Sequence, residues 1–300
     1  MFSRKLPALS IIIFSGISLF AQDVNNLQPW KKSSGFEYTV FEDDPSKIAK
    51  LSVALDYLYL NFGKNNIDGT AIDFGLNSTY NLSRNLELNG TVHLPMLNFE
   101  KPASLYSDFN AVFYVLSKTR KRDIDVSLKY KSVEIGDTRY TSSTSVNVPD
   151  RQVLKKVGFR GGLYFRKSAY KLESGLNDLT GGMIQMGIYG GLQLFNNVNV
   201  RIRFLDQERQ TETAVIYYFD LLTLNTSFDN ALLAAGYKAT HSAIQPFGFR
   251  LGVLFRPIMP TLESARKGFF GNTEYRTEFG YRPVDGPFFN MGVGWSFYRE

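Results

Sequence analysis

A period-two alternation of large apolar residues with small or polar ones constrains this chain more than any other feature. It is clearest near the C-terminus, where positions 289–297 read Phe-Asn-Met-Gly-Val-Gly-Trp-Ser-Phe. Successive side chains of a β-strand point to opposite faces, so this segment has one apolar face and one small, polar face. In a soluble sheet the apolar face meets a core, whereas in a transmembrane barrel it meets lipid and the polar face lines the interior.

The same alternation recurs along the chain from about Leu51. In one segment Ile124, Val126 and Leu128 alternate with Asp125 and Ser127. We count about fourteen such segments of roughly ten residues each, the length needed to cross a bilayer at a tilt. Twelve segments is the alternative count, because the stretch 214–238 is apolar on both faces. The pattern predicts an all-β protein, a transmembrane antiparallel up-and-down β-barrel.

The connections between these segments alternate in length. Short turns are predicted at 81–85, 117–122, 167–168 and 196–197, and longer loops at 61–70, 95–108 and 136–152. Short turns at one end and long loops at the other are typical of an outer-membrane barrel, in which the short turns face the periplasm. The long connection at 257–272 falls on the short side and is the exception.

Composition agrees with this prediction. The chain has 15% aromatic residues and 25 glycines, which suit strands, membrane interfaces and tight bends. Beyond the N-terminus no apolar run is long enough for a transmembrane helix, so a helical membrane protein is excluded. A soluble β-sandwich is the rival fold, because it would bury the same apolar faces between two sheets.

The N-terminus predicts export. Arg4 and Lys5 precede an apolar stretch at 6–20 that ends at Ala21, which is the pattern of a signal peptide cleaved after Ala21. We expect residues 22–47 to form a periplasmic arm or partial plug, and residues 48–300 to form a single barrel domain. There is no cysteine, so neither a disulfide nor a lipid anchor on sulfur is available.

The charge balance argues against nucleic acid as a partner. The formal charge of +6 falls to +4 when Arg4 and Lys5 are removed, and basic residues are interspersed with acidic ones. Nucleic-acid-binding proteins instead concentrate positive charge on one surface.

The signal ending in Ala21-Gln22, the Gly- and aromatic-rich alternation and the last strand together make the chain resemble outer-membrane β-barrel proteins of the Bacteroidetes kind. The resemblance implies a Gram-negative outer membrane and contact with its lipid. It also implies that the barrel-assembly machinery reads the final strand. In that strand the assembly signal would be Phe289, Met291, Val293, Trp295 and Phe297. In this family the strand typically ends on an aromatic residue, whereas here Tyr298, Arg299 and Glu300 follow Phe297.

Arginines recur on the predicted interior face of the later segments. They are Arg160, Arg166, Arg201, Arg203, Arg250, Arg256, Arg276 and Arg282. One interpretation is a positively lined passage or binding site that favours anionic solutes. The other is an internal ladder of ion pairs, because buried charges require partners. The candidate partners are Asp56, Asp73, Glu87, Asp123, Asp125, Glu173, Glu274 and Glu278.

Catalysis and metal binding have little support. His93 and His241 are the two histidines, and His241 and Ser242 would point to opposite faces of an extended strand. No metal-ligand spacing is present, and we expect no cofactor. The leading prediction is therefore a non-enzymatic barrel for passive passage or binding of small solutes. The alternatives are a structural or envelope-complex subunit that makes contacts through loops 95–108 and 136–152, and a lipid-modifying enzyme.

Overall fold

The computed structural model describes most of the chain from Tyr38 onward, in eleven stretches. These are residues 38–42, 44–46, 48–63, 72–95, 105–135, 138–174, 177–204, 207–229, 246–256, 273–283 and 286–299. The predicted signal peptide, most of the predicted arm and His241 lie outside them. Internal contacts divide the chain into Met1–Tyr38 and Thr39–Glu300, and the second unit contains the barrel. None of the described residues belongs to a helix that is long and apolar enough to cross a membrane.

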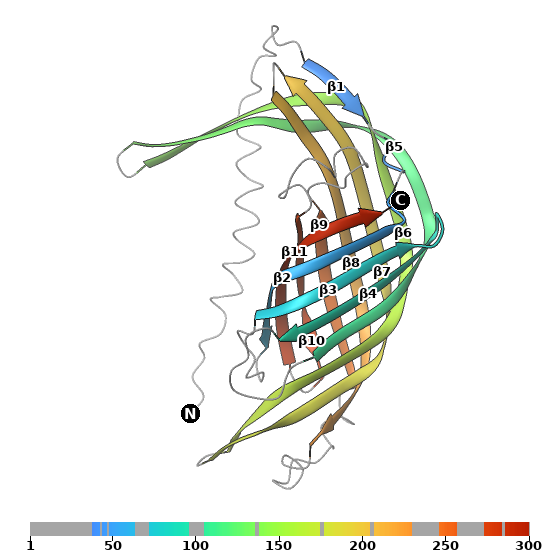
Figure 1. Cartoon of the computed structure of the whole chain (residues 1–300), viewed down its shortest axis with the longest axis vertical. Coiled ribbons are helices and arrows are strands. Elements are labelled where there is room, and N and C mark those ends of the chain that lie inside the picture. The colour runs from blue at the N-terminus through green and yellow to red at the C-terminus, as the bar shows by residue number, and fades with distance from the viewer. Residues whose placement is uncertain are drawn as a thin grey trace. The chain divides into compact units, whose positions relative to one another are not determined.

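The described residues form eleven strands. They are β1 (Tyr38–Glu42), β2 (Leu51–Gly63), β3 (Ile72–Asn81), β4 (Leu86–Pro95), β5 (Leu105–Ile135), β6 (Thr138–Ser174), β7 (Asn177–Phe204), β8 (Gln207–Phe228), β9 (Phe247–Arg256), β10 (Thr273–Arg282) and β11 (Gly286–Arg299). Each strand from β2 to β11 pairs antiparallel with the next along the chain, and β11 pairs with β2. These ten strands therefore close into an up-and-down barrel, with β1 outside it on β7 (Figure 1).

The predicted all-β barrel is confirmed, but with ten closing strands among the described residues instead of fourteen. The turn predicted at 81–85 is present between β3 and β4. Those predicted at 117–122, 167–168 and 196–197 are wrong, because β5, β6 and β7 run without interruption through these positions. Three pairs of predicted short strands are thus three long strands. The predicted loop 136–152 is likewise wrong, since β6 covers it from Thr138.

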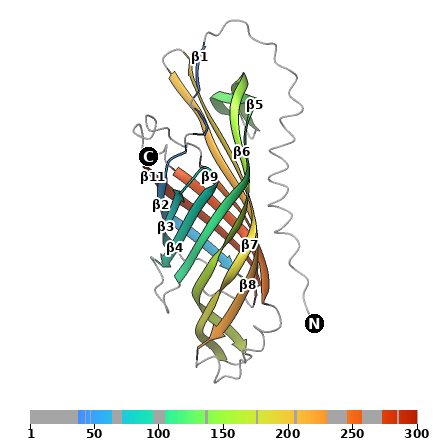
Figure 2. The ribbon, with the colours of Figure 1, turned by 90° about the vertical axis from the view of Figure 1, so that its right-hand side faces the viewer.

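Four long strands continue past one end of the barrel. We call this end the rim; it is where Leu51 of β2 pairs with Arg299 of β11 and where the β3–β4 turn lies. Beyond it, residues 117–135 of β5 pair with residues 138–156 of β6, and the end of β7 pairs with the start of β8 (Figures 1 and 2). We call the β5–β6 part the hairpin extension. The register of this pairing shifts between Arg122 and Ile124. Asp150 lies opposite this shift, and its φ of 59° is unusual for a non-glycine residue.

The faces of the barrel are inverted relative to a soluble protein. Large apolar side chains point outward and are exposed, including Leu163 at 61% and Ile188 at 62%. On β11 the apolar residues from Phe289 to Phe297 face outward, as predicted. The residues that alternate with them, Asn290, Gly292, Gly294 and Ser296, are buried. The interior buries many charged and polar groups. A β-sandwich is therefore wrong for this chain, because one closed sheet carries its apolar face on the outside.

Glycines on the interior face make room for the large side chains that fill it. A Cβ at Gly252 of β9 would collide with the ring of Tyr218 on the neighbouring β8. A Cβ at Gly75 of β3 would collide with the imidazole of His93 on β4. The small residues of the alternation thus serve close packing inside the barrel, where a bulky ring lies over the neighbouring glycine.

Candidate functional site in the barrel interior

Arg250 of β9 is the centre of an interior ion-pair network. Its side chain is almost fully buried, with 1% of the residue exposed. Its Nη1 lies 2.5 Å from Asp108 Oδ2 and 3.8 Å from Glu278 Oε1, and its Nε donates to Asp220 Oδ2 at 2.7 Å. The three carboxylates come from β5, β10 and β8, so one guanidinium joins strands from opposite sides of the barrel. Buried charges of this kind are stable only with such partners.

Arg160 of β6 adds a second buried cation to the same network. Its Nε lies 3.2 Å from Asp220 Oδ1, and its guanidinium lies 4.0 Å from the centre of the Tyr218 ring. Two tyrosines complete the arrangement, because Tyr189 donates a hydrogen bond to Asp108 and Tyr218 donates one to Glu278. Arginines stacked on tyrosine rings gain cation–π attraction in addition to their ion pairs.

A second group of polar side chains surrounds Arg276 of β10. Its guanidinium lies 3.2 Å from Glu274 and 3.8 Å from Asp56. Asp56 also accepts a hydrogen bond from Asn77 at 2.5 Å and contacts His93 Nε2 at 2.9 Å. Most charged groups in both clusters thus meet an opposite charge or a hydrogen-bond donor, as buried polar groups require.

Six of the eight predicted arginines lie on the inward face of the barrel. Besides the three already described, Arg256 donates to Glu274 at 3.0 Å, Arg166 is buried, and Arg282 lies 3.6 Å from the centre of the Phe288 ring. Arg201 and Arg203 are the exceptions. They pair with Gln210 and Glu208 of β8. Both of these residues precede Ala214, where the pairing of β8 with β9 begins, so this part of β7 and β8 lies past the rim. They lie outside the closed barrel because β7 does not turn at 196–197.

The predicted acidic partners divide in the same way. Asp56, Glu274 and Glu278 form the ion pairs above, and buried Glu87 accepts from Tyr114 Oη at 2.9 Å. Asp73 is buried, and the side chain of Glu173 lies outside the described residues. The prediction is wrong for Asp123 and Asp125, because both are exposed on the hairpin extension.

Sequence reasoning missed Asp108 and Asp220, which hold Arg250. Strand parity could have placed Asp108, which directly precedes the outward Phe109, on the inward face. Asp220 lies in the segment that is apolar on both faces, where parity gives no signal.

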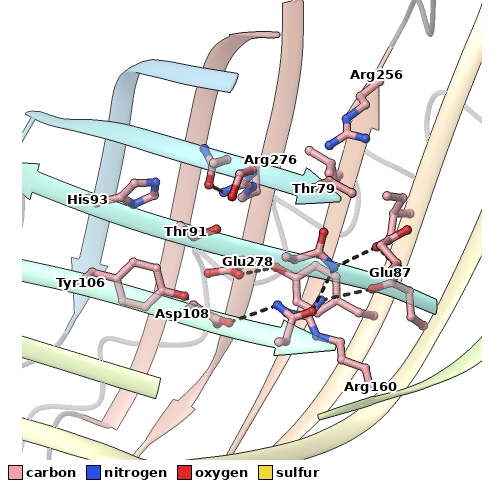
Figure 3. A pocket seen from close by; sticks show the side chains of 18 of the residues that line it. Thr79, Glu87, Thr91, His93, Tyr106, Asp108, Arg160, Arg256, Arg276 and Glu278 are labelled. Carbon is pink, nitrogen blue, oxygen red and sulfur yellow. Dashed lines mark hydrogen bonds between the residues drawn. The ribbon is translucent and has the colours of Figure 1, made fainter. Parts of the chain in front are cut away.

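These side chains leave little open space. One cavity between them measures about 60 Å³, and its walls include Arg160, Arg256, Arg276 and Glu278 (Figure 3). Such a volume holds a few water molecules, each of which needs roughly 10 to 15 Å³. Within the part of the chain that the structure describes, no group of three or more His, Cys, Asp or Glu side chains could hold a metal ion.

No protein-family model matches the sequence, and no curated protein matches it either. Among solved structures, the chain is similar to the CymD monoaromatic hydrocarbon channel, with 8% identity over 86% of this chain and 94% of that chain and a TM-score of 0.24. It is also similar to the loop L8 deletion mutant of OmpT, an outer membrane protein of Vibrio cholerae, with 9% identity over 87% and 99% of the two chains and a TM-score of 0.18. These TM-scores are too low to assign a fold, so the assignment of the barrel fold depends on the strand pairing and burial described above.

Proposed function

We propose that this chain is an outer-membrane β-barrel whose interior is closed by ion pairs, and that it acts as a non-enzymatic structural subunit of the cell envelope. One observation carries the proposal: apolar side chains cover the outside of a closed barrel while buried charges fill the inside. The resemblance to barrels of the Bacteroidetes kind suggests the group of organisms in which to look for it.

Membrane insertion explains the exposed apolar surface. Soluble monomers rarely expose contiguous apolar patches larger than a few hundred Å². Here outward Phe, Leu, Ile and Met residues occur on many neighbouring strands around the barrel. A closed barrel pairs the backbone groups of its strands with one another, so it can enter hydrocarbon without unsatisfied sheet edges.

The filled interior favours a structural subunit over an open passage. A solute that crosses the barrel would have to separate Arg250 from Asp108 and Asp220, which would leave buried charges without their partners. Passage or binding of small anionic solutes remains the second candidate, because Arg160, Arg256 and Arg276 line the cavity.

The long strands suggest how such a subunit reaches its partners. The hairpin extension continues past the rim, and its residues 117–123 are exposed on both faces. The start of β2, the end of β11 and the short β3–β4 turn lie at the rim, and short turns of an outer-membrane barrel face the periplasm, so we infer that the rim is the periplasmic end. The extension would therefore project toward envelope proteins in the periplasm.

Conductance in planar lipid bilayers tests the closed interior. We expect no steady current through the wild-type protein, and ion current through the double variant Arg160→Ala/Arg250→Ala, which loses two large interior side chains. Lys167→Ala is the control, because Lys167 is exposed on the outward face of β6. Steady, anion-selective current through the wild-type barrel would overturn the closed interior and support solute passage.

A further inference from the structure

A second, larger cavity lies at the rim, apart from the interior network. It measures about 380 Å³, within the range of roughly 300 to 1,000 Å³ typical of small-molecule sites. Arg84 of the β3–β4 turn, Val115, Ser117 and Thr119 of β5, and Lys156 of β6 line it. We call it the rim pocket.

Lys156 gives the rim pocket a buried positive charge. The residue is only 6% exposed, and its ammonium lies 4.8 Å from the centre of the Tyr114 ring. Its Nζ donates to the backbone oxygen of Arg84 at 3.1 Å, which uses one of three N–H groups. Among the described residues, no carboxylate lies within ion-pair distance of Lys156. With the hydroxyls of Ser117 and Thr119 nearby, the pocket offers donors and positive charge suited to a phosphate group.

More positive charge lies on the hairpin extension, on residues that alternate with the pocket-lining Ser117, Thr119 and Lys156 and therefore point to the opposite face of the two strands. Lys118, Arg120 and Arg122 of β5 are exposed, as is Lys155 of β6. The register places Lys118 directly opposite Lys155. Like charges in that position destabilise a pair of strands, and together they add to the positive potential around the rim.

The rim pocket also meets the apolar exterior of the barrel. Val115 lines the pocket and is 52% exposed, and its neighbours Phe113 and Leu116 are equally exposed apolar residues. A free phosphate would gain nothing from these side chains. An amphiphile with a phosphate head and acyl chains would use both surfaces, because its chains would lie against the same outward residues that contact lipid.

We propose that the rim pocket binds the phosphate headgroup of an anionic phospholipid, with the acyl chains against Phe113 and Leu116. This inference rests on the proposed membrane location. Positive charges close to a membrane surface each strengthen binding to anionic lipid by about 1 kcal/mol, or roughly fivefold in affinity.

Titration of the folded protein in detergent micelles with dihexanoyl phosphatidylglycerol tests the proposal. We expect binding of this lipid, weaker binding of dihexanoyl phosphatidylcholine, and still weaker binding of inorganic phosphate. Arg84→Gln should weaken phosphatidylglycerol binding about fivefold, and Lys156→Gln by at least as much. The matched control Lys167→Gln removes one exposed charge from β6, near the end of the barrel opposite the rim, and should bind like the wild type.

Three results would overturn the lipid site: equal binding of the two lipids, undiminished phosphatidylglycerol binding in both pocket variants, or binding of inorganic phosphate as tight as that of the lipid. Arg84 is exposed in a turn, so Arg84→Gln keeps the test valid even if Lys156→Gln fails to fold. Failure of the proposed membrane location would be recognised separately, as wild-type protein that stays in solution without detergent.

Discussion

At the residue scale, the interior of this barrel depends on charges that compensate one another. Arg250 meets Asp108 and Asp220, each of which is also buried. Removing the cation would leave these carboxylates without their principal partner in a low-dielectric interior, whereas removing an exposed charge would leave no such group behind.

Arg250→Ala should therefore lower the free energy of unfolding by about 3 to 5 kcal/mol. Urea unfolding in detergent micelles, followed by tryptophan fluorescence, measures the change. Arg250→Lys should recover only part of the loss, because an ammonium cannot contact Asp108 and Asp220 with the same forked geometry. A wild-type unfolding midpoint in Arg250→Ala would contradict the assigned ion pairs.

The interior glycines lead to a second residue-scale prediction. In Gly252→Ala the new methyl group would collide with Tyr218, which donates to Glu278, so the ring must shift. Overpacking of this kind costs about 1 to 3 kcal/mol. In the control Gly161→Ala, the nearest neighbour of the new Cβ is Tyr189 O at 3.6 Å, an ordinary contact. Unfolding of both variants under the same conditions should show a loss in Gly252→Ala alone.

At the scale of the elements, period-two alternation located the strands but not all of their ends. The turn at 81–85 was predictable, because polar residues there separate two regular alternations. The polar run Lys118–Arg122 carries the same signal and yet lies within β5. The hairpin extension is exposed to water on both faces at this point, so its strand residues are as polar as those of a turn. A polar run identifies a turn only where the flanking strands end, and not where they continue into water, as β5 does.

The outer part of the hairpin extension, residues 123–150, should be dispensable for closure of the barrel. Replacing residues 123–150 by an Asn-Gly turn retains the pairing of Leu105–Arg122 with Arg151–Lys167, which contains the barrel part of both strands. We expect the shortened protein to fold and to migrate differently in boiled and unboiled samples on a gel, as the full chain should. Loss of this difference in the shortened protein alone would show that the extension is needed for folding.

At the scale of the whole molecule, the sequence predicted that apolar side chains face outward and polar ones inward, but it did not predict which side chains meet in the interior. Alternation identifies two faces and strand length favours a membrane, so residues such as Leu163 could be placed outside without a structure. Which acid meets which arginine depends on pairing across the barrel between residues more than a hundred positions apart, as in Asp108 and Arg250. No local pattern encodes such a pair, so the network and the filled interior required the fold.

The absence of cysteine allows a direct test of the inverted barrel, because a single introduced thiol can be labelled without background. In outer-membrane vesicles that have been made permeable, Lys121→Cys should react with a water-soluble maleimide, since position 121 lies on the hairpin extension and is exposed. Position 163 is also exposed on the bare protein, but Leu163→Cys should stay unreactive in the membrane, because lipid covers it. Solubilisation in detergent followed by unfolding in urea should make both thiols react, which confirms that each is present. Equal labelling of the two positions in intact membranes would mean that water reaches Leu163, and the barrel could then not lie in the bilayer as proposed.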